Sequence, residues 1–135
     1  MGRLHALGGG WDLYGLSGGF IKIHRRALVK TFTLADMQGG WFIGDFEPTC
    51  FQTSEFEVAA KSYRKADIDA RHVHRVATEI TLIVSGRARI NDVELAAGTI
   101  AVLEPGEAAS FEALEDTITM VVKIPSIRGD KYLIE

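Results

Sequence analysis

The feature that most restricts the fold is a succession of short β-type segments separated by turn residues. FEVAAKSY (56–63), EITLIVSG (79–86) and TITMVVKI (117–124) are rich in aliphatic, β-branched and aromatic residues. Segments of this length and composition, bounded by turn residues, are typical of strands. Helical periodicity over ten or more residues is hard to find. The sequence therefore predicts an all-β fold, an antiparallel sandwich or barrel whose strand residues alternate between interior and surface.

Three details of this pattern can be checked against a structure. FEVAAKSY places Phe56, Val58 and Ala60 on one strand face and Glu57 and Lys61 on the other. The segment that ends it, VAAKSYRKADIDARHV, favours a strand followed by a loop. TITMVVKI is almost continuously apolar, which predicts burial on both faces.

Two turn-like segments lie further along the chain. The strand predicted over EITLIVSGRARI (79–90) is expected to bend or turn at Gly86. After the last strong strand, PSIRGDKY (125–132) predicts a C-terminal extension packed over the barrel, with the RGD tripeptide as a surface turn.

A glycine-rich arm precedes these segments. Residues 1–19 hold seven of the 14 glycines, and yet they include Leu4, Leu7, Trp11, Leu13, Tyr14 and Leu16. A purely disordered tail would rarely carry so much apolar surface. We expect a loop-like arm over residues 1–19 that packs on something, such as a partner subunit, and a single β domain over residues 20–135.

Length and charge narrow the function classes. A chain of 135 residues suits one domain, and a net charge of −3 with mixed signs gives no basic footprint for nucleic acid. No apolar run is long enough to span a membrane, and the N-terminus lacks the pattern of a signal peptide. The single cysteine, Cys50, cannot form an internal disulfide, which favours a cytoplasmic protein.

The residues richest in chemistry are His72, His74 and Glu79. In an extended strand, the spacing of the two histidines directs both imidazoles to one face. Two histidines and a carboxylate suit a divalent metal (iron, manganese, nickel or zinc) and leave positions open for water, substrate or oxygen. The alternative is a histidine pair on an ordinary solvated strand.

This segment resembles the first motif of the cupin superfamily, G-x5-H-x-H-x(3,4)-E-x6-G. His72, His74, Glu79 and Gly86 reproduce its second half, and its opening glycine is absent. The resemblance covers roughly residues 54 to 124.

The second cupin motif, G-x5-P-x-G-x2-H-x3-N, is half present. Gly98 matches its start, and Pro105 and Gly106 match its turn with a one-residue shift. The family's fourth ligand, a histidine, would fall at Ala109, and alanine cannot bind a metal. Glu107 shares its strand parity, but we interpret it as a solvated residue at the turn.

The resemblance implies a small single-domain cupin: an antiparallel jelly-roll β-barrel with a divalent metal held by His72, His74 and Glu79. It also implies a small-molecule ligand or substrate. Chemistry in the family ranges over dioxygenation, isomerisation, lyase reactions and decarboxylation, and the fold does not choose among them. Two alternatives stay open: a non-catalytic module that binds a sugar or carboxylate, and a metal-free sugar isomerase or epimerase that uses Tyr63 with His72 or His74.

Four further side chains lie on strands beside the motif. If they faced inward, Lys61, Tyr63, Arg87 and Arg89 would orient an anionic or sugar-like substrate, but we expect them by default to be solvated.

Cupins commonly pair through edge strands and N-terminal segments. The resemblance therefore implies a homodimer, in which the apolar arm covers a sheet edge of the neighbouring subunit.

Overall fold

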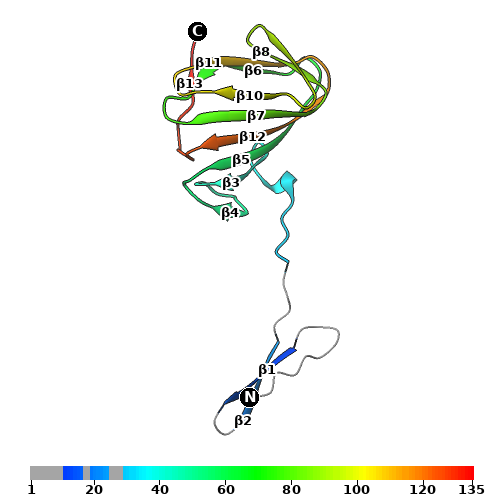
Figure 1. Cartoon of the computed structure of the whole chain (residues 1–135), viewed down its shortest axis with the longest axis vertical. Coiled ribbons are helices and arrows are strands. Elements are labelled where there is room, and N and C mark those ends of the chain that lie inside the picture. The colour runs from blue at the N-terminus through cyan, green and yellow to red at the C-terminus, as the bar shows by residue number, and fades with distance from the viewer. Residues whose placement is uncertain (1–10, 17–18, 25–28) are drawn as a thin grey trace. The chain divides into compact units, whose positions relative to one another are not determined.

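The computed structural model describes residues 11–16, 19–24 and 29–135, which fall into two units divided between Thr31 and Phe32. In the first unit, β1 (Trp11–Leu16) and β2 (Gly19–His24) form an antiparallel hairpin (Figure 1). A strand within residues 20–24 is thus confirmed, but its partner lies in the segment expected to be loop-like. The packing predicted for the arm's side chains lies outside the described residues, and the boundary at residue 20 stays a prediction.

The second unit consists of two sheets. The first has the order β10-β7-β12-β5-β3-β4 and comprises β10 (Ile100–Leu103), β7 (Thr78–Ser85), β12 (Thr117–Ile124), β5 (Glu57–Tyr63), β3 (Trp41–Gly44) and β4 (Phe51–Gln52). The second has the order β13-β6-β11-β8-β9 and comprises β13 (Tyr132–Leu133), β6 (Ile68–Val73), β11 (Ala108–Ala113), β8 (Arg87–Ile90) and β9 (Val93–Ala96). All neighbouring strands are antiparallel except β3 and β4.

The chain passes back and forth between these sheets (Figure 1). β5, β7, β10 and β12 lie in the six-stranded sheet, and β6, β8, β9 and β11 between them in sequence lie in the other. This alternation confirms the predicted antiparallel jelly roll. A 3-10 turn, η1 (Leu34–Asp36), is the one helical element in the described ranges. None of the described helices is long and apolar enough to cross a membrane.

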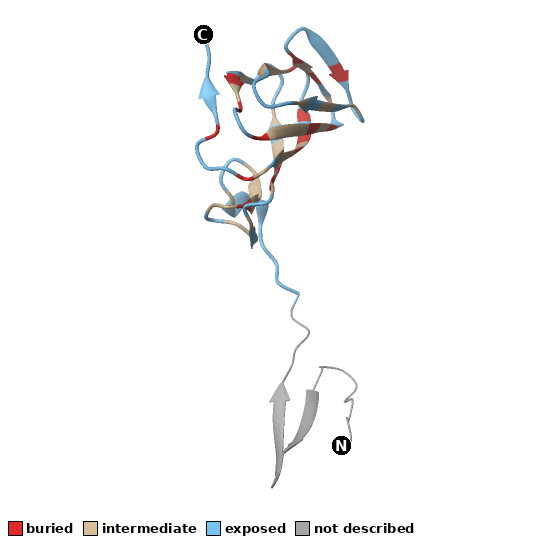
Figure 2. Cartoon of the chain, turned by 60° about the vertical axis from the view of Figure 1, so that its left-hand side comes forward, coloured by how far each residue is buried: buried red, intermediate tan, exposed pale blue. Residues whose placement is uncertain are grey.

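An apolar core lies between the sheets. It is formed by Ile83, Ala88, Ile90, Leu95 and Ala109, with Ile83 and Ala88 fully buried. Figure 2 shows buried positions recurring along the strands of both sheets. This core occupies only part of the interior, because several inward positions on the six-stranded sheet are polar, namely Glu57, Thr81, Thr117 and Thr119.

β5 illustrates that polar interior. The predicted alternation is correct, but the charged face is the inner one: Glu57 and Ala59 are buried, and Lys61 borders the cavity described below. The Glu57 carboxylate is compensated by the Lys123 ammonium at 2.6 Å and by a hydrogen bond from the Ser126 hydroxyl at 2.9 Å. Buried charge is tolerated where it is paired in this way.

β12 corrects a second expectation. Thr117, Thr119 and Val121 are buried, whereas Ile118 and Ile124 are 44% and 47% exposed. Only one face of this strand is therefore buried within the chain. Because the neighbouring strands share its register, the outer face of the sheet carries two apolar rows, Val102–Ile80–Val122–Val58 and Ile100–Leu82–Met120–Ala60.

β6 occupies residues for which the sequence predicted a loop. It pairs with β11 on one side and β13 on the other, which supplies its hydrogen bonds although it is mostly exposed. Ala109 pairs with His72 and Phe111 with Asp69, so β6 contains one extra residue at this point. Such a bulge re-aims side chains, and Asp69 borders the same cavity as His72.

The C-terminal extension packs on the barrel as expected. β13 adds to the edge of β6, and the Ile134 N–H donates to the Arg71 carbonyl at 3.0 Å. The expected surface turn at RGD is wrong for its last residue, because Asp130 is only 5% exposed.

Candidate metal centre

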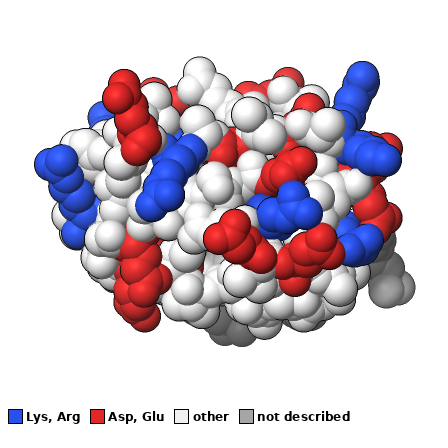
Figure 3. Space-filling model, turned by 90° about the horizontal axis from the view of Figure 1, so that it is seen from above, with Lys and Arg blue, Asp and Glu red and all other residues white. Residues whose placement is uncertain are grey.

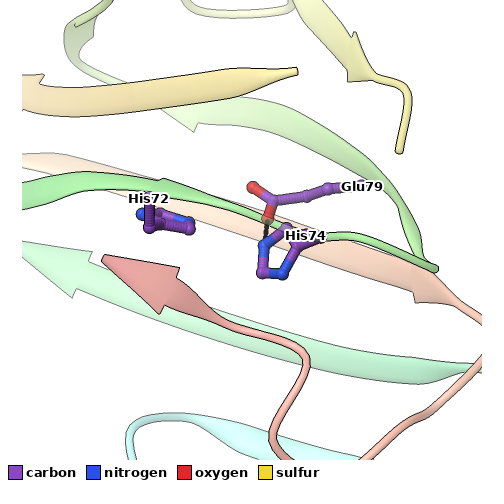
Figure 4. Close-up of side chains that lie close together, drawn as sticks. All are labelled: His72, His74 and Glu79. Atoms are coloured by element: carbon purple, nitrogen blue, oxygen red, sulfur yellow. Dashed lines mark hydrogen bonds and ion pairs between the residues drawn. The ribbon is translucent and has the colours of Figure 1, made fainter. Parts of the chain in front are cut away.

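β6 and β7 bring the predicted ligands together. His72 lies in β6, His74 directly follows that strand, and Glu79 is the second residue of β7. One donor atom from each residue lies within 4.8 Å of the other two. Both histidines are buried, at 8% and 6% exposure. Figure 4 shows the three side chains close together, with the His74–Glu79 contact dashed.

Hydrogen bonds fix the orientation of both imidazoles. Nδ1 of His72 lies 2.8 Å from the Ala70 carbonyl, and Nδ1 of His74 lies 2.5 Å from the Asp130 carbonyl. A carbonyl only accepts, so each Nδ1 carries the proton and donates it. In each histidine the carbonyl therefore selects the tautomer whose Nε2 is available as a metal ligand. Metal-bound histidines usually donate the hydrogen of their other ring nitrogen in this way.

Glu79 is held between a hydroxyl and an imidazole. Its Oε1 accepts a hydrogen bond from the Thr81 hydroxyl at 3.1 Å, and its Oε2 lies 2.8 Å from His74 Nε2. Burial is the largest single influence and favours the neutral acid. The hydrogen bonds from His74 and Thr81 and the positive charge of the nearby imidazoles together outweigh it, and the pKa of Glu79 falls below its usual value. The hydrogen bond between His74 and Glu79 is the main cause of a raised pKa for His74, and the Asp130 carbonyl adds to it.

This donor set fits a divalent cation. His74 has an acceptor oxygen at each ring nitrogen, so a cation must lie between Nε2 and Glu79, either a proton or a metal ion. Imidazole nitrogen and carboxylate oxygen are ligands that several of the predicted metals accept, so His72, His74 and Glu79 would be able to hold such an ion.

Asp130 ties the C-terminal extension to the loop between the ligands. Its carboxylate accepts hydrogen bonds from the backbone N–H groups of Arg75 at 2.9 Å, Val76 at 3.2 Å and Ala77 at 2.9 Å. The Asp130 backbone carbonyl accepts the hydrogen bond from Nδ1–H of His74. No local sequence pattern indicated this role, because Asp130 is more than fifty residues from the loop that it holds.

Ala109, at the position of the family's fourth ligand, lies beside the three candidate ligands. Ala109 pairs directly with His72 across the β6–β11 ladder and borders the same cavity. Its methyl group leaves that side of the centre without a protein donor. Glu107 is exposed at the turn, where it accepts a hydrogen bond from the Glu104 N–H, in agreement with the interpretation as a solvated residue.

A cavity of about 100 Å3 adjoins the three ligands. This volume holds a small molecule rather than a nucleotide-sized one. Its wall combines polar and charged residues with apolar ones, namely Trp41, Lys61, Tyr63, Asp69, Thr81, Ile90, Leu103, Ala109, Ser110, Phe111, Thr119, Val121, Lys123 and Lys131.

The four side chains beside the motif divide into two pairs. Lys61 and Tyr63 border the cavity, contrary to the default expectation, and the Tyr63 ring stacks against Phe111 at 4.5 Å between centroids. Arg87 and Arg89 instead form ion pairs with Glu94, at 2.6 and 3.1 Å. Charges of both signs are also interspersed over the face shown in Figure 3.

Solved structures with this architecture have low sequence identity to the chain. A double-stranded β-helix protein of Klebsiella pneumoniae is 21% identical, with a TM-score of 0.59 over 80% of this chain and 99% of that one. KdgF from a Halomonas species is 18% identical, with a TM-score of 0.51 over 56% of this chain and 74% of that one. Oxalate decarboxylase of Bacillus subtilis is 15% identical, with a TM-score of 0.55 over 60% of this chain and 24% of that one. The latter enzyme contains Mn(II) centres.

No family model matches the sequence, and no curated protein matches it. At these identities the structural likeness defines the fold. The chain has the cupin fold, the double-stranded β-helix that its sequence motif predicted.

Proposed function

We propose that the protein is a small metal-dependent cupin. His72, His74 and Glu79 hold a divalent ion in this proposal, and an oxygen-rich small metabolite is the substrate. The observation that carries it is the donor set: two buried imidazoles with occupied Nδ1 atoms face one carboxylate within 4.8 Å. An ordinary solvated histidine pair would have neither the burial nor the fixed tautomers.

The residues around the ion have separate roles. A bound divalent metal would act as a Lewis acid toward a substrate oxygen. Thr81 holds one Glu79 oxygen, and the Ala70 and Asp130 carbonyls hold the two imidazoles in place. Ala109 leaves room for substrate or water where a fourth protein ligand is missing. Such a centre suits dioxygenase, isomerase or lyase chemistry.

The two alternatives have unequal support. The absent ligand at Ala109 favours a non-catalytic binding module for a sugar or carboxylate, which we retain as the second candidate. A metal-free isomerase would use Tyr63 with His72 or His74 as an inward-facing acid/base pair, and all three residues border the cavity. Burial raises the pKa of Tyr63, which keeps the phenol protonated and unable to act as a base at neutral pH.

We also propose that the protein is cytoplasmic and homodimeric. Cys50 is free, which suits a reducing compartment. The outer face of the six-stranded sheet exposes apolar side chains such as Ile100 and Val102, which supports self-association.

Turnover by metal-loaded protein tests this proposal. Protein stripped with chelator and reloaded with Mn2+, Fe2+, Ni2+ or Zn2+ would be incubated with hydroxy acids, keto acids, dicarboxylates and uronic acids, and followed by NMR. We expect turnover only with metal, lost in Glu79→Gln and retained in Glu107→Gln. Metal-dependent binding without turnover would overturn the enzyme in favour of the binding module. Turnover by stripped protein would overturn the metal-dependent mechanism.

A further inference from the structure

The cavity wall contains three lysines, of which two are already paired. Lys123 forms its ion pair with Glu57 at 2.6 Å, and Lys131 pairs with Asp69 at 3.0 Å. Lys61 has no carboxylate within 4 Å among the described residues. The Lys61 ammonium lies 5.2 Å from the centroid of the Trp41 ring. A half-buried ammonium facing a cavity without a counter-ion is suited to an anionic ligand.

A second unsatisfied group stands next to Lys61. Thr119 is 1% exposed. Its hydroxyl oxygen is the one buried side-chain nitrogen or oxygen atom without a hydrogen-bond partner in the described part of the chain. Thr119 pairs with Lys61 across the β5–β12 ladder, and both residues border the cavity. Directly opposed side chains lie about 5 Å apart at Cβ, so one ligand oxygen can reach both. Buried polar atoms normally find a partner, and a ligand in the cavity would supply it.

The charge of the cavity agrees with this. Glu79 cancels only half the charge of a divalent ion, and the Lys123 and Lys131 pairs are neutral. With a divalent ion bound, Lys61 and the metal centre would give the wall a net positive charge, because bound cations are the largest local charges in such sites. A volume of about 100 Å3 limits the anion to a few carbons.

We propose that Lys61 and Thr119 form a carboxylate-binding subsite, so that the ligand is a small organic acid with a second oxygen donor that reaches the metal. This inference rests on the proposed function for its metal end. The Lys61 ammonium and the Thr119 hydroxyl hold the carboxylate at the other end.

Calorimetric titration with malate and malonate tests the subsite, with malonamide as an uncharged comparison. In metal-loaded protein we expect Lys61→Met to weaken carboxylate affinity by about tenfold or more, since hydrogen bonds to charged groups are strong. Thr119→Val should weaken it less, by about threefold to tenfold, and Thr119→Ser should retain it. Lys65→Met, on an exposed turn residue, is the matched control and should change nothing. Malonamide should bind weakly to every variant.

Metal content, measured on every variant, separates the two proposals. Unchanged carboxylate affinity in folded, metal-loaded Lys61→Met and Thr119→Val would overturn the subsite and leave the metal centre standing. Equal binding of malonamide and malonate to the original chain would also overturn it. If the original chain takes up no metal, the proposed function fails. If that metal-free chain still binds carboxylate, and Lys61→Met weakens the binding, the subsite is supported. If the metal-free chain binds no carboxylate, both the subsite and the proposed function are overturned.

Discussion

Lys61 is held where its charge works against folding. Burial is the main cause that lowers the pKa of Lys61, and the Lys123 and Lys131 ammonium groups act in the same direction. Asp69 and Glu79 oppose this without cancelling it. A base whose pKa falls on folding binds its proton more weakly in the folded state, which destabilises the fold at every pH where the side chain is charged. Arrangements that reduce folding stability in this way cluster at functional sites.

We therefore predict that Lys61→Met stabilises the metal-free protein. At pH 7 the melting temperature should rise by about 2–5 °C, because the uncompensated charge is removed and the methionine side chain is accommodated by the same wall. The difference should shrink as pH rises toward 10.5, where the lysine is losing its proton in the unfolded state as well. Calorimetric scans of both proteins at matched pH values check this. A lower melting temperature for Lys61→Met at pH 7 would contradict it.

Asp130 acts on the centre through the loop that it orders. Replacing its carboxylate by an amide turns one of the two acceptor oxygens into an NH2 donor. At least one of the three backbone N–H groups then loses its partner, which loosens the chain between His74 and Glu79. We predict that Asp130→Asn lowers metal affinity by about 10–100-fold, the usual range for outer-shell changes. Competition with a fluorescent chelator measures this. Asp92→Asn, at an exposed turn, is the control, and equal affinity in both variants would exclude the role.

At the scale of single elements, Gly86 separates β7 from β8. Its φ is +85°, and a Cβ there would lie 2.3 Å from the Asp116 carbonyl oxygen. The end of the strand at this residue was predictable, because a glycine interrupts an apolar run. The close approach of a second strand was not.

Gly86→Ala should therefore cost far more than the same change at Gly98. Gly98 has an almost identical φ of +86°, but its Cβ would meet nothing within 4 Å. We predict a loss of about 3 kcal/mol or more at Gly86 and of about 1 kcal/mol at Gly98, where only the backbone conformation resists. Urea unfolding of the two variants measures the difference. Equal losses would show that backbone strain alone decides both sites.

How far the elements follow from sequence depends on what buries them. β7 and β12 were predictable from their apolar β-branched runs. The ligand motif could be recognised by spacing because β6 is extended at His72 and ends directly before His74. β6 as a whole was missed because its stability comes from pairing with β11 and β13 rather than from apolar side chains. On β5 the alternation was visible, but its direction was not, because the interior is polar around the site.

The same limit applies to the residues that complete the centre. His72, His74 and Glu79 lie within eight residues of one another, so a local motif contains them. Asp130 and Thr119 reach the site only through long-range pairing, which no local pattern encodes.

For the whole molecule, the outer face of the six-stranded sheet is the main unexplained surface. Its two apolar rows contain no charged residue, and Ile100 and Val102 on β10 are 61% and 52% exposed. Contiguous apolar surface of this kind marks interaction sites. We propose that a second copy of the chain covers it, because two such uncharged faces are self-complementary and sheets pack well face to face.

Lysine substitution on this face should abolish the dimer. We predict that Ile100→Lys with Val102→Lys gives a folded monomer by light scattering, because burying two charges against an apolar face is costly. Ile68→Lys, at a 73% exposed position on the other sheet, should stay dimeric. The arm is tested separately by removing residues 1–19. If the shortened chain is a monomer by light scattering, dimerisation depends on the arm. A monomeric original chain would contradict the homodimer altogether.

The central claim, a metal ion held by His72, His74 and Glu79, is tested most directly by elemental analysis. The protein would be purified without added metal or chelator and compared with His72→Ala and with His24→Ala, which removes a histidine from the other unit. We predict close to one divalent ion per chain in the original protein and in His24→Ala, and about a tenth of that or less in His72→Ala. Absence of metal from the original protein, with no uptake on reconstitution, would contradict the account.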